Sequence, residues 1–382
     1  MRIGLVSTYM PPHPGGIEHV AANLFTGYGR AGHSVRWLTS LIPRDQPRHE
    51  GKVVRVPCFN AIEDWLGVPV PVWGPSALPE LCRLAEWADV LHVVEALYLP
   101  SAMAVAVARH VGKPVVLCQN IGFVPYRRRA LEWIERLAYA TLGRAVLLGS
   151  SHVVLATPAA EEFVRSLLGR RLARASFIPV GIDTDLFHPA SPDERVAARR
   201  SLGLEDDRAV ALFAGRLVEK KGVPVVLAAA ARLPEVQFLL AGDGPLRDLQ
   251  RTAPSNVRWL GQAGREEMVR LYHASDAILL PSRGEGLPLF VQEAMSCGLP
   301  AVIRREEVYA AELLALGLCS GAPAEGAAVA RSFVEALTAP AEFRARVREH
   351  AVRQWGIDEM ISRYAAIMRS LAPGRPDPEE IF

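Results

Sequence analysis

The sequence has few cysteines, and their number and spacing exclude several classes of protein. Its 382 residues include five cysteines, and no two of them stand at the close spacing of a zinc or redox motif. A small domain held together by disulfide bonds is therefore excluded. Each cysteine lies in or beside an apolar run, which predicts reduced thiols in the core. The five are Cys58, Cys82, Cys118, Cys297 and Cys319.

Long hydrophobic runs are also lacking. The longest, Ala96–Ala108, contains Pro100 and is shorter than the ~20 apolar residues that a membrane-spanning helix needs. Only a few apolar residues precede Ser7, too few for the apolar region of a signal peptide. We therefore expect a cytoplasmic protein whose contact with a membrane, if it has one, is peripheral.

Neither sign of charge dominates the composition. The chain has 43 Lys and Arg against 41 Asp and Glu, which is typical of a globular protein and argues against nucleic acid as a partner. The two halves differ, however. Residues 1–180 hold 19 basic and 13 acidic side chains, whereas residues 181–382 hold 24 and 28. The N-terminal half is therefore the basic one.

Short apolar segments alternate with segments of helical length along both halves of the chain. Strands that are apolar throughout belong in buried parallel sheets, so the pattern predicts an α/β protein. The strands expected in the first half are Arg2–Ser7, Ser34–Thr39, Val90–Val94, Val115–Cys118 and Val153–Ala156. Those expected in the second half are Ala209–Ala214, Val236–Ala241, Val257–Leu260, Ala277–Leu280 and Pro300–Ile303.

A chain of this length is expected to form two domains, because a single core stops growing beyond roughly 250 to 300 residues. The irregular stretch Ile178–Pro192 separates the two alternating patterns. We predict doubly wound, Rossmann-like domains over residues 1–183 and 184–355. The remaining residues, 356–382, are expected to form a helix that packs back towards the N-terminal domain, followed by a loose tail.

Ligands of parallel sheets bind outside the carboxyl ends of the strands, so the loops that follow strands are the places to search. In the second half, Gly215 and Arg216 follow one strand, and Lys220 and Lys221 stand at the next helix. Cations beside a helix N-terminus are suited to a diphosphate, although the lysines could equally be solvated surface charges. The next loop, Gly242 to Pro245, has good turn chemistry and is a weaker indication of a nucleotide.

The loop after Ala277–Leu280 carries two carboxylates, Glu285 and Glu293, eight residues apart. If both positions were helical, the two side chains would lie within about 80° of each other on one face. One could then bind a sugar and the other a ribose. A buried Glu293 needs a partner, and a bound diol supplies two hydroxyl donors. The alternative is that one glutamate caps a helix while the other faces solvent.

These motifs resemble those of the GT-B nucleotide-sugar glycosyltransferases, in particular retaining glycosyltransferase family four. The resemblance covers nearly the whole chain, because the motifs stand in the order of the family. They are Gly15-Gly16, Gly181-Ile182-Asp183 to Phe187, Gly215-Arg216 to Lys221-Gly222, Gly242 to Pro245, Asp276 to Ser282, and Glu285 to Glu293. The resemblance implies two Rossmann-like domains that face a central cleft.

The resemblance also implies roles for individual residues. Arg216 and Lys221 would hold the donor diphosphate, Glu285 the sugar hydroxyls and Glu293 the ribose. From the other domain, Gly15 and Gly16 would close on the phosphate. The remaining residues of the implied nucleotide-sugar site are Gly215, Gly242, Gly244, Gly286 and Leu287.

Two positions depart from the family pattern. Where the family commonly has a histidine after the strand Val115–Cys118, this chain has Asn120, which can bind a hydroxyl but cannot take a proton. We include Asn120 with Arg216, Lys221 and Glu285 among the candidate catalytic residues. Farther on, Arg304–Glu307 replaces a glycine-rich turn, which predicts a differently shaped loop near the sugar.

No metal or cofactor is expected. Asp183 and Asp185 match the Asp-x-Asp pattern by which other glycosyltransferases hold Mg²⁺, but they lie in the irregular linker between the two α/β halves. The nucleotide sugar itself is a substrate. We therefore expect a metal-independent reaction in which cations of the protein stabilise the leaving diphosphate.

A basic stretch, Arg127, Arg128 and Arg129, leads into a segment with Trp133 and Tyr139. Such a combination favours contact with an anionic membrane surface, although a core helix with solvated arginines fits equally well. We therefore consider a glycan or lipid-linked acceptor presented at a membrane.

The function expected from these features is hexosyl transfer, with retention, from a UDP- or GDP-linked sugar to an acceptor hydroxyl in glycan or glycolipid synthesis. One alternative is a nucleotide-sugar epimerase of the same fold, for which His13, His19 and His92 are the histidine candidates of the first half near strand ends. Another is a non-catalytic nucleotide-binding subunit. The base, the sugar and the acceptor do not follow from the sequence.

Overall fold

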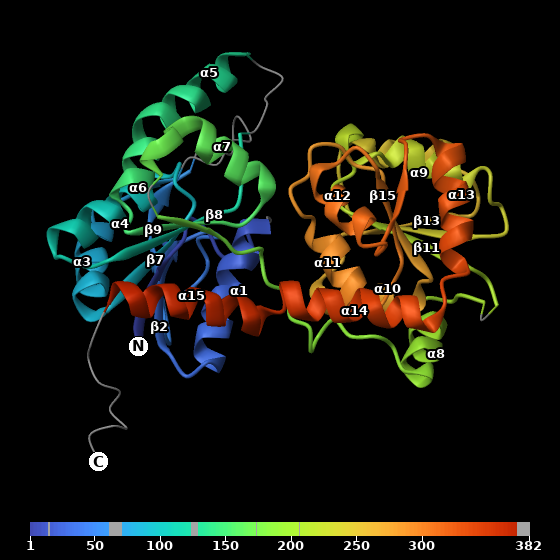
Figure 1. Cartoon of the computed structure of the whole chain (residues 1–382), viewed down its shortest axis with the longest axis horizontal. Helices are drawn as coiled ribbons and strands as arrows, with labels where there is room; N and C mark the ends of the chain where they lie inside the picture. Colours follow the sequence, from blue (N-terminus) through green and yellow to red (C-terminus); the bar gives the residue numbers. More distant parts are fainter. Residues whose placement is uncertain (14–15, 61–70, 124–128, 173, 206, 373–382) are drawn as a thin grey trace. The chain divides into compact units, whose positions relative to one another are not determined.

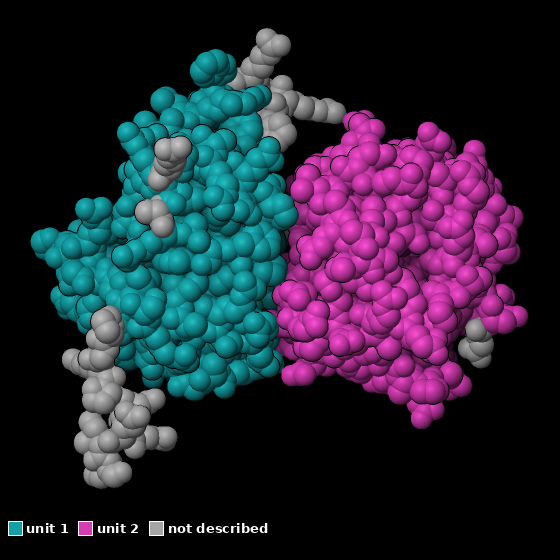
Figure 2. Space-filling view, viewed as in Figure 1, with its two compact units in different colours: residues 1–181, 357–382 teal, residues 182–356 magenta. Residues whose placement is uncertain are grey.

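The computed structural model describes residues 1–13, 16–60, 71–123, 129–172, 174–205 and 207–372. It divides into two compact units, which are coloured separately in Figure 2. Unit 1 comprises Met1–Gly181 together with Ile357–Phe382, and unit 2 comprises Ile182–Gly356. The chain thus leaves unit 1 two residues before the expected boundary and returns to it at Ile357.

In the described part of unit 1, eight strands form a sheet in the order β10-β9-β8-β7-β1-β2-β4-β3. All pairs are parallel except β3 with β4. The strands are β1 (Arg2–Val6), β2 (Ser34–Ser40), β3 (His49–Glu50), β4 (Val53–Val56), β7 (Val90–Val94), β8 (Val115–Gln119), β9 (His152–Leu155) and β10 (Ala175–Phe177). A separate pair consists of β5 (Cys58–Phe59) and β6 (Val72–Trp73).

Helices cover this sheet (Figure 1). They are α1 (Gly16–Arg30), α3 (Ala77–Trp87), α4 (Leu99–His110), α5 (Arg129–Ala138), α6 (Arg144–Gly149), α7 (Pro158–Leu168) and α15 (Ile357–Leu371). The π-helical turn Tyr139–Gly143 joins α5 to α6. The short 3₁₀ turn Gly169–Arg171 follows α7.

The last helix, α15, belongs to the core of unit 1. It packs against α1, where a Cβ at Gly27 would lie 2.6 Å from Ile361, so a glycine lets the two helices approach closely. Met360, Tyr364 and Met368 are buried on the same side of α15. The apolar residues of α15 stand at helical spacing and therefore form one face of the helix. Helix α1 of the same unit contacts this face.

In unit 2, the described strands form a parallel sheet in the order β13-β12-β11-β14-β15-β16. The strands are β11 (Val210–Ala214), β12 (Gln237–Ala241), β13 (Val257–Gly261), β14 (Ala277–Leu280), β15 (Ala301–Arg304) and β16 (Ser320–Ala322). Figure 1 shows helices around the sheet. They are α8 (Pro192–Ser201), α9 (Val223–Ala230), α10 (Arg265–Ala274), α11 (Leu289–Ser296), α12 (Val308–Ala315), α13 (Gly326–Leu337) and α14 (Ala341–Trp355), with 3₁₀ turns at Glu219–Lys221 and Pro245–Thr252.

The central strands of unit 2 are buried on both faces. β11 and β14 read VALFA and AILL, and every residue of β14 is fully buried. Such continuous apolar strands cannot face water on either side, so helices must cover the sheet on both faces. The carboxyl ends of the strands then remain as the places where polar loops can gather.

Each sheet has one point where the strand order reverses. In unit 1 this point lies between β1 and β7, and in unit 2 it lies between β11 and β14. The loops that follow two such neighbouring strands leave in opposite directions, so a crevice opens outside their carboxyl ends. These two crevices are where ligands of doubly wound sheets bind.

Candidate functional site

Three glycines bring the loops after β11 and β12 into backbone contact. At Gly242 (φ +134°) a Cβ would lie 1.9 Å from the carbonyl oxygen of Gly215, and at Gly244 (φ +152°) it would lie 2.7 Å from that of Leu217. The amide of Leu217 also donates to the oxygen of Asp243 at 2.9 Å. Only glycine fits at Gly242 and Gly244, so these residues form the floor of the crevice in unit 2.

Lys221 extends across this floor. Its Cδ and Cε lie 3.7 Å from the position of a Cβ at Gly215, and its Nζ lies 2.9 Å from Oε1 of Glu285. Both side chains of this ion pair are largely buried, with exposed fractions of 17% and 12%. Arg216 and Lys220 are exposed. The structure therefore pairs two residues for which the sequence predicted separate roles, and it distinguishes Lys221 from its neighbour Lys220.

The loop after β14 is fixed by contacts from two sides. The carboxylate of Glu307 accepts hydrogen bonds from the amides of Gly284 (3.0 Å) and Glu285 (2.8 Å). The amide of Arg283 donates to the carbonyl of Lys220 at 2.7 Å. Glu307 lies in the segment that replaces the family's glycine-rich turn. Its carboxylate holds the backbone of the loop that carries Glu285. This role of Glu307 was not predicted from the sequence, because it depends on β14 and β15 being neighbours in the sheet.

Glu285 and Glu293 do not share a helical face. Helix α11 begins at Leu289, so Glu285 lies in the preceding loop and the angular argument from the sequence is wrong. Gly286 and Leu287 are half-buried in the same loop. The loop places Glu285 at Lys221, whereas Glu293 lies in the second turn of the helix.

Glu293 is a half-buried carboxylate with a tyrosine partner. Tyr272 of α10 donates its hydroxyl to Oε2 at 2.8 Å. Burial raises the pKa of Glu293 to about 7, although the bond from Tyr272 and the charge of Arg265 act in the opposite direction. A ligand that donates hydroxyl protons would favour the ionised form, because hydrogen bonds to a carboxylate lower its pKa. Tyr272 had no indication in the sequence.

Asn120 lies at the carboxyl end of β8 in unit 1. Its Nδ2 donates to Oε1 of Glu95 at 2.8 Å, and its carbonyl accepts from Thr157 Oγ1 at 2.9 Å. Glu95 itself follows β7, one side of the crevice of unit 1, and was also missed by sequence reasoning. Gly16 is the first residue of α1, whereas Gly15 lies outside the described residues.

The histidine candidates of the first half have different surroundings. His92 is fully buried in β7, and its Nδ1 lies 2.8 Å from the hydroxyl of Tyr28. Burial lowers its pKa to about 3, so it is a neutral core residue. His13, in the loop after β1, has Nδ1 3.0 Å from Oε1 of Glu18 on α1. His92 thus lies in the middle of a buried strand, whereas His13 lies in a loop.

Asp183 and Asp185 lie at the start of unit 2. Oδ1 of Asp183 accepts from the amide of Leu186 at 3.2 Å, and its carbonyl accepts from the amide of Phe187 at 2.9 Å, so Asp183 closes a turn. Within the part of the chain that the structure describes, there is no group of three or more His, Cys, Asp or Glu side chains placed to hold a metal ion.

The basic stretch predicted to contact a membrane lies mostly outside the described residues. This holds for Arg127 and Arg128, while Arg129 begins α5. The described part of α5 exposes three large apolar side chains, Trp133, Ile134 and Leu137, with exposed fractions of 62–73%. No helix within the described ranges is long and apolar enough to cross a bilayer.

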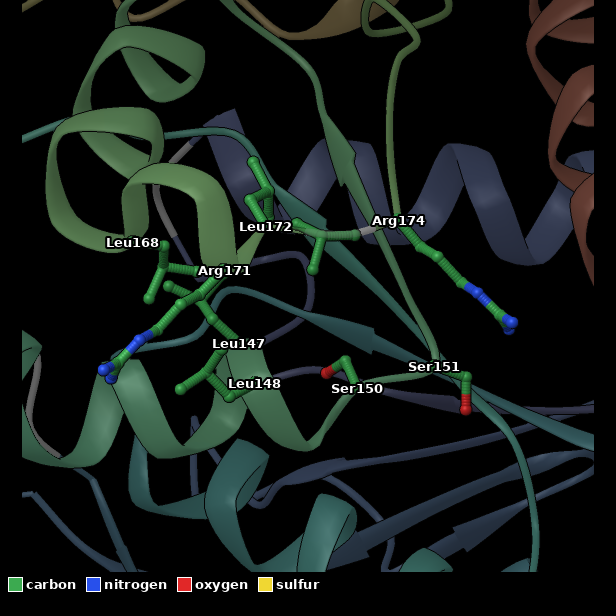
Figure 3. Close-up of a pocket in the computed structure, with 9 residues that line it drawn as sticks. Leu147, Leu148, Ser150, Ser151, Leu168, Arg171, Leu172 and Arg174 are labelled. Atoms are coloured by element: carbon green, nitrogen blue, oxygen red, sulfur yellow. The ribbon is translucent and has the colours of Figure 1, made fainter.

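A cavity of about 300 Å³ lies elsewhere in unit 1 (Figure 3). Its lining residues come from α6, α7 and the segments that precede β9 and β10, so it lies at the amino ends of these strands. Figure 3 shows the guanidinium groups of Arg171 and Arg174 pointing away from each other and from the leucines. The lining residues are Leu147, Leu148, Ser150, Ser151, Val153, Leu168, Arg171, Leu172 and Arg174. This cavity is separate from both crevices.

Two family models match the chain. Residues 14–186 match the model described as Glycosyltransferase Family 4, and residues 194–353 match the one described as Glycosyl transferases group 1. Together they cover both α/β units. The chain belongs to this family of glycosyltransferases, as the order of its motifs indicated.

Curated relatives match part of the chain. A D-inositol 3-phosphate glycosyltransferase of Mycobacterium sp. (strain KMS) is 36% identical over 156 residues, which are 37% of this chain and 34% of that protein. The alpha-galactosylglucosyldiacylglycerol synthase of Streptococcus pneumoniae is 29% identical over 170 residues, 41% of this chain and 45% of that protein. The matches thus span less than half the length of these relatives.

Solved structures match nearly the whole chain. Sucrose-phosphate synthase from Thermosynechococcus elongatus has a TM-score of 0.74 at 19% identity, covering 97% of this chain and 98% of that one. Anabaena HepE, solved in complex with UDP, has a TM-score of 0.73 at 17% identity, covering 97% and 100%. At such identities the likeness shows the fold alone. The predicted GT-B fold is confirmed.

Proposed function

We propose that the protein transfers a hexosyl group from a nucleoside diphosphate sugar to an acceptor hydroxyl. The observation that carries the proposal is the Lys221–Glu285 ion pair above the glycine floor at the strand-order reversal of unit 2. A diphosphate needs a cation and close backbone approach, and a sugar needs a hydrogen-bond acceptor. Lys221 supplies the cation and Glu285 supplies the acceptor, with 2.9 Å between Nζ and Oε1.

When the donor binds, Lys221 and Glu285 separate and contact different parts of the same ligand. Lys221 and Arg216 neutralise the diphosphate. The carboxylate of Glu285, whose backbone amide donates to Glu307, accepts hydrogen bonds from sugar hydroxyls. Glu293 accepts from the two ribose hydroxyls beside its bond from Tyr272. Because Glu285 and Glu307 are anchored before a ligand arrives, little reorganisation is needed during the reaction.

The proposed reaction retains the anomeric configuration. The bond between the anomeric carbon and the diphosphate oxygen breaks, and the acceptor oxygen forms its new bond on the same face. The acceptor proton passes to the departing diphosphate oxygen. Negative charge grows on the diphosphate as the bond breaks, so Arg216 and Lys221 stabilise the transition state more than the bound donor.

Incubation with a donor and no acceptor tests this function against its alternatives. We expect slow release of free sugar and UDP from UDP-glucose, or of mannose and GDP from GDP-mannose, measured by NMR. Epimerised nucleotide sugar would indicate an epimerase. Donor binding in a thermal-shift measurement, without turnover in the presence of glycan and glycolipid acceptors, would indicate a nucleotide-binding subunit. A ligand at 100 times its dissociation constant adds about 2.7 kcal/mol to stability, which such a measurement detects.

The proposed reaction is independent of metal ions. Asp183 engages its own turn, and the cationic side chains of Arg216 and Lys221 supply the positive charge that Mg²⁺ would otherwise bring. We expect turnover of the donor to be unchanged within a factor of two in excess EDTA. The control is Asp185→Asn, which should be equally insensitive. Loss of turnover in EDTA, restored by Mg²⁺ or Mn²⁺, would contradict metal independence.

We propose further that the acceptor is presented at an anionic membrane, on its cytoplasmic face. Support comes from the exposed apolar side chains of α5, with the basic stretch directly before them in the sequence. Each arginine near an anionic surface contributes about 1 kcal/mol, and apolar side chains can enter the interface. A lipid-linked sugar is the simplest acceptor of this kind.

Co-sedimentation with liposomes tests the membrane contact. We expect binding to anionic vesicles at low salt, weaker binding at high salt, and little binding to neutral vesicles, because salt screens charges beyond about 8 Å at physiological ionic strength. Joint replacement of Arg127, Arg128 and Arg129 by serine should abolish the salt-dependent part. Replacement of Trp133 and Leu137 by serine should weaken binding at every salt concentration. If the wild type does not sediment with anionic vesicles at low salt, a soluble acceptor becomes the better proposal.

A further inference from the structure

The backbone of Glu95 is held in an unfavourable conformation. Its φ is +68°, and among the described residues it is the one residue other than glycine with a positive φ. A glutamate in this region has a higher conformational energy than a glycine, so the surrounding contacts must hold it there. Glu95 directly follows β7, beside β1, at the reversal of strand order in unit 1.

The side chain of Glu95 is buried and accepts hydrogen bonds from residues at the end of β8. Oε1 accepts from the backbone amide of Asn120 at 2.7 Å and from its Nδ2 at 2.8 Å, and Oε2 accepts from Nε2 of Gln119 at 2.7 Å. Gln119 returns the contact, because its Oε1 accepts from the amide of Ala96 at 2.9 Å. The unusual φ thus places the carboxylate of Glu95 against the end of β8.

These contacts fix the orientation of the Asn120 amide. An ionised carboxylate can only accept hydrogen bonds, so the nitrogen of the amide, and not its oxygen, faces Glu95. Oδ1 lies 3.5 Å from Sγ of Cys118, on the inner side. Nδ2 carries two hydrogens, and within the described residues Glu95 is the one acceptor that it contacts. Asn120 is half-buried, so the second hydrogen is left for a ligand at the carboxyl end of the sheet.

We propose that Glu95 is a positioning residue that holds the Asn120 amide as a directional N–H donor to an oxygen of a ligand in the crevice of unit 1. This inference rests on the proposed function for the identity of the ligand. Asn120 then gives a hydrogen bond from a fixed geometry, and Glu95 determines that geometry without contacting the ligand. A residue that preorganises a donor raises the rate of the chemical step more than it raises affinity for the nucleotide.

The positioning depends on the protonation of Glu95. Burial raises the pKa of Glu95 to about 7, the charge of Glu18 on α1 adds to this, and the bonds from Asn120 act in the opposite direction. The other titratable groups that face it are Cys118 of β8, Tyr139 of the π-helical turn and Tyr364 of α15, and burial raises the pKa of all three well above neutrality. Protonated Glu95 carries a donor of its own. The Asn120 amide is therefore fixed above neutral pH and released as the pH falls through about 7.

The first experiment observes the Asn120 side chain without any substrate. In protein labelled with ¹⁵N-asparagine, the two side-chain amide protons of Asn120 are identified by their loss in Asn120→Ala. We expect them to titrate with a midpoint near pH 7 in the wild type and to remain constant in Glu95→Gln. Signals that do not respond to pH in the wild type, or that still titrate in Glu95→Gln, would overturn the proposal. This result does not depend on the proposed function.

The second experiment measures turnover of UDP-glucose, or of GDP-mannose if that is the donor used. Glu95→Gly removes the carboxylate and relieves the positive φ, so it is the variant least expected to unfold. We expect kcat about tenfold lower, with KM for the donor within twofold and no further loss when Glu95→Gly is combined with Asn120→Ala. An equal loss in the Asn120→Ala background would show that Glu95 acts independently of Asn120, and would overturn the proposal.

The conservative variant separates positioning from structure. Glu95→Gln mimics the protonated carboxyl, because it has one acceptor oxygen and one donor group, but it does not titrate. We therefore expect its kcat at pH 8 to be about as low as that of the wild type at pH 6, and its rate to stay flat from pH 6 to 8. The wild type should lose rate as the pH falls below 7. A pH profile that is the same in the two proteins would overturn the proposal. Absence of turnover in the wild type would contradict the proposed function instead, and the amide signals would still test the contact.

Discussion

Replacement of Arg216 or Lys221 by alanine is expected to lower turnover of the donor about 10²- to 10³-fold. Each variant removes one preorganised cation from the diphosphate, where negative charge grows in the transition state. At about 1.36 kcal/mol per decade, this corresponds to roughly 3–4 kcal/mol of lost transition-state stabilisation. Lys221→Ala also leaves Glu285 without its ion-pair partner at 2.9 Å. The measurement is kcat and KM for the donor, at saturating acceptor or for hydrolysis.

Lys220→Ala is the matched control for this prediction. Lys220 precedes Lys221 in the same 3₁₀ turn and has the same charge, but its side chain is exposed. Its known contact to the loop after β14 is made by the backbone carbonyl, which the substitution preserves. Turnover should stay within a factor of about three, as for an exposed charge. Near-normal rates for both Arg216→Ala and Lys221→Ala would contradict the assignment of the diphosphate site.

Much of the fold follows from the sequence because β strands buried on both faces have a simple pattern. β11 and β14 are apolar throughout, β12 is apolar after Gln237, and the predicted bounds of all three differ from the structure by at most one residue. The return of α15 to unit 1 is less directly encoded. Its apolar face shows that the helix is covered, but the covering partner depends on a glycine, Gly27, more than 300 positions earlier in the chain.

The candidate site could be predicted only where a residue has unusual chemistry in its own loop. Lys221 and Glu285 stand beside glycines, and Glu293 is a carboxylate among apolar neighbours, so the sequence indicates all three. Glu307 and Glu95 act through backbone amides or an amide side chain of other strands, and such contacts depend on the order of strands in the sheet. That order is a tertiary property, which is why both were missed.

The angular relation of Glu285 and Glu293 shows a different limit. An angle of about 80° between them requires both residues to be helical, but Pro288 immediately precedes α11 and the loop before it contains two glycines, Gly284 and Gly286. Gly284 has a φ of +64°, which a helix does not contain. The glycines could have indicated a loop, so here the error lay in using helical periodicity across a segment with turn chemistry.

Gly242→Ala is expected to abolish donor binding without removing any charged group. A Cβ there would lie 1.9 Å from the carbonyl oxygen of Gly215, and φ is +134°, a region that alanine rarely adopts. The loop after β12 must therefore move away from the loop after β11. A shift of about 1 Å in such a position costs on the order of 10²-fold in rate, because Lys221 and the backbone floor no longer meet the diphosphate together. Donor affinity by calorimetry and kcat/KM should both fall by at least about this factor.

Two other glycines separate the causes of this loss. Gly317→Ala introduces alanine at φ +62° where nothing lies within 4 Å, so it reports the cost of backbone strain away from the site. Gly264→Ala has open space and no positive φ, and it should leave both stability and activity unchanged. Strain of this kind costs about 1–3 kcal/mol, so Gly317→Ala should lower the unfolding temperature while donor affinity stays within about threefold. If Gly242→Ala binds UDP-glucose and GDP-mannose no worse than Gly317→Ala does, contact between the two loops is not what forms the diphosphate floor, and the charged groups of Lys221 and Arg216 must bind the donor independently of it.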